Sequence, residues 1–211
     1  MGEISPIKRI PKEPAHPVTS NDLQADDPPS DTPPSDAPTA RMLSWARNSA
    51  VYRLERQMMT EKQLFDAITR KARQKFEDIS QQQLKAVAEF AVKFAYDLNA
   101  LNDADYAQLS TQSAVRSGKS KRAIAQKLSA KGIDRETAAV ALEETDDLFA
   151  AVVFARKRAF GPFRRGELDD KRKAKELSAF ARNGFGFEIG RKVFEMSSEQ
   201  AESVLRKDAF T

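Results

Sequence analysis

The sequence contains no cysteine, and its single histidine, His16, lies in a proline-rich segment. The absence of cysteine excludes disulfide bonds, thiolate nucleophiles and cysteine-ligated zinc. With no other histidine, the commonest general base and metal ligand is missing from the rest of the chain. The sequence also has no glycine-rich dinucleotide motif, no Walker motif and no nucleophile elbow. We therefore expect a non-enzymatic protein with no metal and no other cofactor.

Long apolar runs are missing as well. No stretch of about eighteen apolar residues occurs, and the opening MGEISPIKRI lacks the apolar core of a secretory signal. We therefore expect a soluble, cytoplasmic chain with no membrane partner. Its 211 residues are enough for one or two domains.

Proline is scarce everywhere except near the beginning of the chain. Nine of the ten prolines precede residue 40, in a segment that includes DDPPSDTPPSDAPTA. Almost no large apolar side chains are present there to offset the entropy of ordering, so the composition predicts a disordered tail over residues 1–40. The tail carries a net charge of −4, and residues 41–211 carry +8. A basic body suits an acidic or polyanionic partner and equally suits solubility alone, so charge does not decide between them.

From residue 41 onward the apolar residues recur at helical spacing, and no stretch shows sustained alternation of β-branched residues. The predicted fold class is therefore all-α. In the second half of the chain, helices are expected at about 120–131, 134–144, 146–160, 169–182, 186–195 and 198–207.

Capping patterns indicate where two earlier helices begin. Thr60 with Gln63 and Ser80 with Gln83 have the spacing of a capping box, in which each side chain satisfies a backbone N–H of the other residue. The helix after Ser80 is expected to bury an apolar face that reaches Leu98.

Two later segments resemble each other. SKRAIAQKLSAKG ends at Gly132 and RKAKELSAFARNG ends at Gly184, and a large apolar residue follows each glycine. A basic helix with this ending predicts a glycine in the left-handed conformation. The residue after each glycine is expected to pack on the helix residue four before that glycine, which pairs Ile133 with Leu128 and Phe185 with Phe180.

A weaker copy ends near Ala72, which lacks the glycine, so this helix can continue to Lys75. Three copies predict three tandem three-helix repeats at residues 41–100, 101–145 and 146–211, the last with an added C-terminal helix. Such repeats mainly contact their neighbours, which predicts an extended, curved body with a concave surface. The alternative is an ordinary helical bundle in which two helices end alike.

Basic residues gather in three groups: from Arg70 to Lys75, from Arg116 to Lys131, and from Arg156 to Lys175. Each group either contacts acidic protein or phosphate, or is a solvated helix face. We favour contact for the third, because arginine, which pairs bidentately with carboxylate and phosphate, is abundant around its GPFRRG loop. The candidate partner-binding residues are Arg116, Lys119, Lys121, Arg122, Arg156, Arg158, Arg164, Arg165, Lys171, Arg172 and Lys173.

Other residues in this region have simpler interpretations. Arg164 and Arg165 flank no apolar helical stripe, so we expect that both charges can be reversed without loss of the fold. Phe160 and Phe163 flank Gly-Pro and could stack on a base, but packing onto the core is the favoured interpretation. A cluster of acids lacks calcium-loop spacing and is interpreted as a solvated helix junction rather than a metal site. Its members are Glu143, Glu144, Asp146 and Asp147.

The segment from Ala100 to Ile133 resembles the central repeat of the RecX family. Its features are a short acidic turn, an aromatic–alanine pair, an arginine, a glycine, a basic-apolar helix and a final Lys-Gly-Ile. They are found here at Asp103, Tyr106, Ala107, Arg116, Gly118, Ile124, Leu128, Lys131, Gly132 and Ile133. The opening segment is similar through Tyr52, Leu54, Arg56, Thr60 and Leu64, and so is AFARNGF at 179–185. The chain departs from the family at Ala72 and in a lengthened first linker.

This resemblance implies three tandem three-helix repeats and a regulator whose partner is the RecA recombinase filament. We separately expect the chain to be a monomer. It further implies that the chain limits strand exchange, ATP hydrolysis and coprotease activity in recombination, DNA repair and the SOS response. Direct contact with single- or double-stranded DNA is a further expectation. The leading alternative is a sequence-independent nucleic-acid-binding protein that acts through its basic faces. A helix-turn-helix transcription factor is a third hypothesis, and an enzyme a distant fourth.

Overall fold

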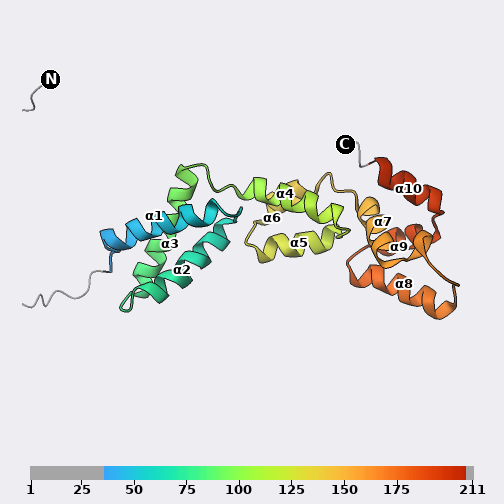
Figure 1. The fold of residues 1–211 in the computed structure, drawn as a ribbon, viewed down its shortest axis with the longest axis horizontal. Helices are drawn as coiled ribbons and strands as arrows, with labels where there is room; N and C mark the ends of the chain where they lie inside the picture. Colours follow the sequence, from blue (N-terminus) through green and yellow to red (C-terminus); the bar gives the residue numbers. More distant parts are fainter. Residues whose placement is uncertain (1–35, 208–211) are drawn as a thin grey trace, which may run out of the picture. The chain divides into compact units, whose positions relative to one another are not determined.

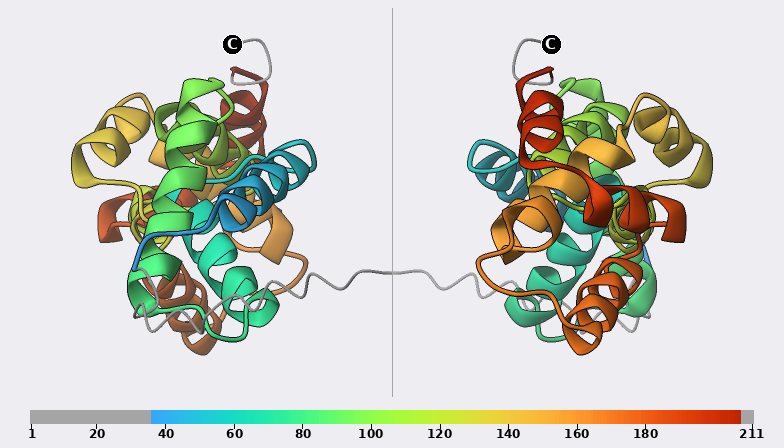
Figure 2. Two further views of the ribbon diagram at one scale, coloured as in Figure 1. Left: turned by 90° about the vertical axis from the view of Figure 1, so that its left-hand side faces the viewer. Right: turned by 90° about the vertical axis from the view of Figure 1, so that its right-hand side faces the viewer.

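The computed structural model describes residues 36–207, which form ten α-helices, one short 3-10 helix and no strand (Figure 2). The predicted all-α fold class is therefore confirmed. The predicted disordered tail lies outside the described residues as far as residue 35, and the first helix begins at Ala40. Within the described range, no helix is both long and apolar enough to cross a membrane.

The first group of helices comprises α1 (Ala40–Leu54), α2 (Glu61–Lys75) and α3 (Gln81–Asp97) (Figure 1). Thr60 and Ser80 form the predicted capping boxes at the starts of α2 and α3. As expected, α2 continues to Lys75 because no glycine stops it. Leu64 and Leu84 belong to the apolar cluster on which the three helices pack.

The second group comprises α4 (Asp103–Arg116), α5 (Lys121–Ala130) and α6 (Arg135–Leu142). Its own apolar cluster contains Ala107, Ile124, Leu128 and Ile133. Small residues such as Ala107 occupy the buried face of α4, where α4 packs on α6.

The third group comprises α7 (Asp147–Arg158), the 3-10 helix η1 (Gly161–Phe163), α8 (Asp170–Arg182), α9 (Phe187–Glu195) and α10 (Ser198–Lys207). Every residue from Phe149 to Ala155 is buried, because α7 contacts α4, α9 and α10. The ring of Phe154 lies 6.1 Å from that of Phe160 and 5.4 Å from that of Phe180. Phe160 and Phe163 pack against this cluster, which confirms the favoured interpretation.

Both predicted glycine stops are confirmed. Gly132 has a φ of +88° and Gly184 one of +86°. The N–H after each glycine closes the helix end, with distances of 3.1 Å from Ile133 N to Leu128 O and 3.1 Å from Phe185 N to Phe180 O. The Phe185 and Phe180 rings lie 6.0 Å apart, and Ile133 and Leu128 share one apolar cluster, as predicted.

Candidate partner-binding surface

Two hydroxyl groups join consecutive groups of helices in the same way. Ser120 caps α5 and donates from its Oγ to the carbonyl oxygen of Asn183, at the end of α8, over 2.7 Å. Thr60 caps α2 and donates from its Oγ1 to the carbonyl oxygen of Lys131, at the end of α5, over 2.6 Å. Both hydroxyl residues are fully buried. The start of α5, where the second basic group is dense, therefore lies against the end of α8.

A second set of contacts links the turn between α4 and α5 to α7. The ammonium group of Lys157 donates to the carbonyl oxygen of Ser117 over 3.0 Å. The backbone N–H of Lys121 donates to Asp147 Oδ1 over 2.7 Å. The second and third basic groups, which are far apart in the sequence, therefore meet. The exposed cations beside this junction are Arg116, Lys119, Arg122 and Arg156.

Glu176 on α8 organises the loop that carries the third group. Its side chain is 1% exposed and accepts four hydrogen bonds. The donors are the backbone N–H of Gly161, at 2.9 Å, two guanidinium nitrogens of Arg164, at 2.9 and 2.8 Å, and Nε of Arg172, at 3.2 Å. Burial by itself would raise the pKa of Glu176, but these hydrogen bonds outweigh burial and hold the pKa below its ordinary value.

Arg164 is thus part of the fold rather than a free cation. Its side chain is 15% exposed, and its guanidinium carbon lies 4.8 Å from the centre of the Phe194 ring. The structure contradicts the premise that Arg164 is a free loop charge: it is largely buried and paired with Glu176, so a glutamate there would face a buried carboxylate. Arg165, the next residue, is exposed.

A hollow of about 440 Å³ lies beside this network, between the end of α7 and the first turns of α8. Its cations outnumber its acids, and one acid, Glu176, is already neutralised by Arg164. A phosphate or carboxylate group would therefore find several donors within one concave site. The lining residues are Arg158, Phe160, Asp169, Lys171, Arg172, Lys175 and Glu176.

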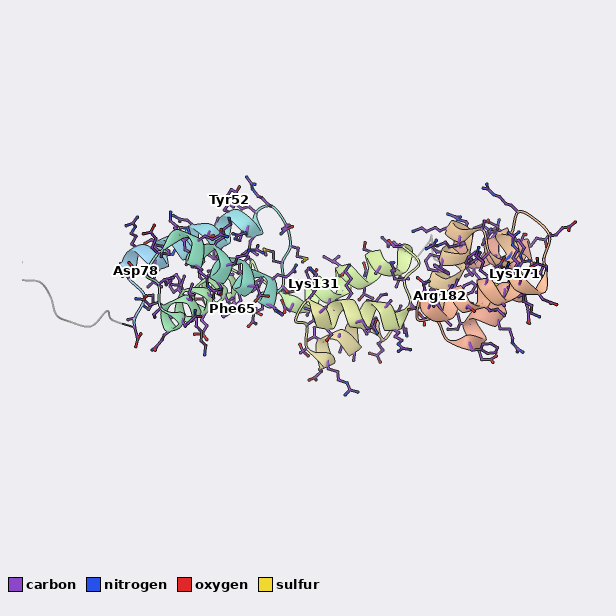
Figure 3. The ribbon with its side chains drawn as sticks, turned by 90° about the horizontal axis from the view of Figure 1, so that it is seen from below. Tyr52, Phe65, Asp78, Lys131, Lys171 and Arg182 are labelled. Atoms are coloured by element: carbon purple, nitrogen blue, oxygen red, sulfur yellow. The ribbon has the colours of Figure 1, made fainter. Side chains whose placement is uncertain are left out.

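The remaining candidate partner-binding residues differ in solvent exposure. Lys173 is exposed, whereas Lys121 is partly covered and its Nζ lies 3.4 Å from the carbonyl oxygen of Glu143. Lys171 and Arg182 mark opposite ends of α8 (Figure 3). Arg182 is an exposed cation outside all three predicted basic groups, and Lys175, the last member of the third group, is exposed as well.

The acidic cluster has structural roles at two of its positions. Asp146 caps α7, and Asp147 accepts the hydrogen bond from Lys121 N. No group of three acids in residues 36–207 is arranged to hold a metal ion.

Comparison with known proteins identifies the family. The sequence model for the second three-helix domain of RecX matches residues 102–142, which span α4 to α6. The regulatory protein RecX of Agrobacterium fabrum is 68% identical over 167 residues, which cover 79% of this chain and 91% of that protein. The chain belongs to the RecX family. The regulatory protein RecX of Myxococcus xanthus is 36% identical to this RecX-family chain over 160 residues, 72% of this chain and 85% of that protein.

The crystal structure of RecX from Lactobacillus salivarius has the same fold. Its TM-score to this RecX-family chain is 0.57, with 24% sequence identity, and the match covers 74% of this chain and 97% of that one. The fold and the relatives together make the chain a RecX-family regulatory protein.

Proposed function

We propose that this RecX-family protein binds the RecA nucleoprotein filament and limits its activity without catalysing a reaction itself. The observation that carries the proposal is the hydrogen bond from Lys157, in the third basic group, to Ser117, within the second, which brings these two groups together. This contact brings cations from different helices onto one surface, which no single helix could do. We further propose that the three groups of helices are repeat units with bounds at 41–100, 101–145 and 146–211.

A filament offers this surface two kinds of negative charge, the phosphates of the bound DNA and the acidic side chains of the recombinase. Several weak ion pairs made at once give useful affinity, because each further contact forms within a complex that already exists. Occupying the filament surface would hinder strand exchange and nucleotide turnover sterically. The exposed residues proposed to make these contacts are Arg116, Lys119, Arg122, Arg156, Arg158, Arg165, Lys171 and Lys173.

Direct binding of nucleic acid is the second candidate. The hollow lined by Arg158 and Lys171 favours it, because its cations surround a space large enough for a phosphate. Under this hypothesis the chain binds DNA with similar affinity whether or not RecA is present, and binding weakens strongly as salt is raised.

The experiment compares inhibition of DNA-dependent ATP hydrolysis by RecA. The test variant combines Arg158→Glu with Lys171→Glu, and a matched control combines Arg41→Glu with Arg135→Glu, two exposed arginines on other helices. We expect the test variant to require at least about tenfold more protein for half-inhibition at low salt, and the control to resemble the wild type. If the test variant inhibits as well as the wild type, the hollow is not part of the interface. If the wild type has no effect on RecA, the proposal is refuted.

A further inference from the structure

A groove whose charged lining residues are mainly acidic lies between α4 and α6, in contrast to the basic surface described above. It has a volume of about 780 Å³ and includes the turn that leads from α6 into α7. Arg116 is the one cation among its lining residues, although the body of the chain is basic. Its acids are Asp105, Glu136, Glu143, Glu144 and Asp146.

Three of these acids have no partner within the described chain. Glu136, Glu143 and Glu144 are exposed and make no side-chain hydrogen bond or ion pair with any residue of the range 36–207. Asp146, in contrast, caps α7 through the N–H groups of the helix's second and third residues. No three acids in this part of the structure lie close enough for one metal ion. The groove therefore suits a ligand whose positive charges are spread over several side chains.

A second, independent feature also indicates a ligand. Thr111 lines the groove and is only 4% exposed, and its hydroxyl has no hydrogen-bond partner in the described residues. A buried hydroxyl without a partner costs free energy, which a bound group could recover. Val140, in the same lining, is 68% exposed and provides an apolar contact on the opposite wall. Gln108 and Gln112 add amide groups that can bind a peptide backbone.

We propose that this groove docks a basic segment of a protein partner, with lysine or arginine side chains beside an apolar residue. The acids would attract the cations, Val140 would contact the apolar side chain, and Thr111 would hydrogen-bond at the base of the groove. The same acids repel phosphate, so a nucleic acid does not fit. The identification of RecA as this partner rests on the proposed function. Sites of opposite charge on one chain would then fix its orientation on the partner.

The first experiment measures the binding of a basic peptide to the groove in the absence of RecA. The probe is a short fluorescein-labelled peptide of alternating lysine and leucine, and binding is followed by fluorescence anisotropy at low salt. The test variant carries Glu136→Gln, Glu143→Gln and Glu144→Gln, and the control carries Glu77→Gln, Glu195→Gln and Glu202→Gln, three exposed glutamates elsewhere. We expect the test variant to bind about tenfold more weakly than the control. Equal affinities, or no binding by the wild type, would overturn the proposal.

The second experiment identifies the partner. Because the chain has no cysteine, Val140→Cys introduces a unique thiol that can carry a benzophenone photo-crosslinker. Irradiation with RecA filaments should attach the groove to a lysine- or arginine-bearing RecA segment, found by mass spectrometry. Attachment to DNA or to a second copy of this chain would overturn the assignment. If the wild type does not bind filaments at all, the proposed function fails, while the peptide measurement still decides the chemistry of the groove.

Discussion

The hydroxyl of Ser120 joins two groups of helices through its 2.7 Å hydrogen bond to the carbonyl oxygen of Asn183. The same hydroxyl accepts the N–H of Ala123 and so also caps α5. Thr60 has the same double role toward Gln63 and Lys131. One side chain thus begins a helix and holds it against the end of another, which positions the basic groups relative to each other.

Ser120→Ala should destabilise the protein by about 2–3 kcal/mol, because it removes a helix cap and leaves the Asn183 carbonyl without its donor. The urea midpoint of unfolding measures this loss. Ser129→Ala, at an exposed position on the same helix, is the matched control and should change stability by less than about 0.5 kcal/mol. Similar midpoints for the two variants would show that the Ser120 bond contributes nothing.

Gly132→Val should cost at least about 2 kcal/mol in unfolding free energy. A β-branched residue resists the φ of +88°, and a Cβ at this position would overlap the side chain of Lys62. Gly186→Ala is the control, because its φ is −60° and a Cβ there meets no atom within 4 Å. That variant should lose less than about 1 kcal/mol. A Gly132→Val protein as stable as the control would contradict the left-handed helix end.

Arg164→Glu and Arg165→Glu should behave very differently despite being neighbours. The first places a carboxylate against the buried Glu176 and should cost about 3–5 kcal/mol. The second changes an exposed side chain and should stay within about 0.5 kcal/mol of the wild type. Thermal unfolding followed by circular dichroism compares them. Any test of this loop in partner binding should therefore use Arg165→Glu, and equal melting temperatures would refute the structural role of Arg164.

The Glu176 network also predicts a pH dependence. Because the folded-state pKa of Glu176 is lowered from the ordinary 4.5, its charge stabilises the fold above that value. This contribution is lost as the pH falls from about 4.5 through the lowered pKa. The difference in unfolding free energy between the wild type and Glu176→Gln, measured with urea, should therefore be largest near neutral pH and decrease below pH 4.5. A difference that does not change over this range would mean that the carboxylate charge is not what stabilises the loop.

Features that depend on neighbouring residues could be predicted from the sequence. The capping boxes at Thr60 and Ser80 involve N–H groups three residues away, and the stops at Gly132 and Gly184 depend on one residue's access to positive φ. The prediction was wrong for Leu98, which is 53% exposed. It follows the last residue of α3, where the chain turns away through Asn99 at a φ of +52°.

By itself the sequence determined the all-helical class, the two capping boxes, the two glycine stops and the three basic groups, because these follow from local spacing and composition. Only the tertiary structure decided which cations are available. Arg164 and Arg172 are bound to Glu176, while Lys171, the neighbour of Arg172 on α8, remains exposed. The hydrogen bond from Ser120 to Asn183 connects residues 63 positions apart in the sequence, and the groove beside Thr111 forms only where α4 and α6 lie side by side. Such contacts depend on how distant segments pack, which no local pattern encodes.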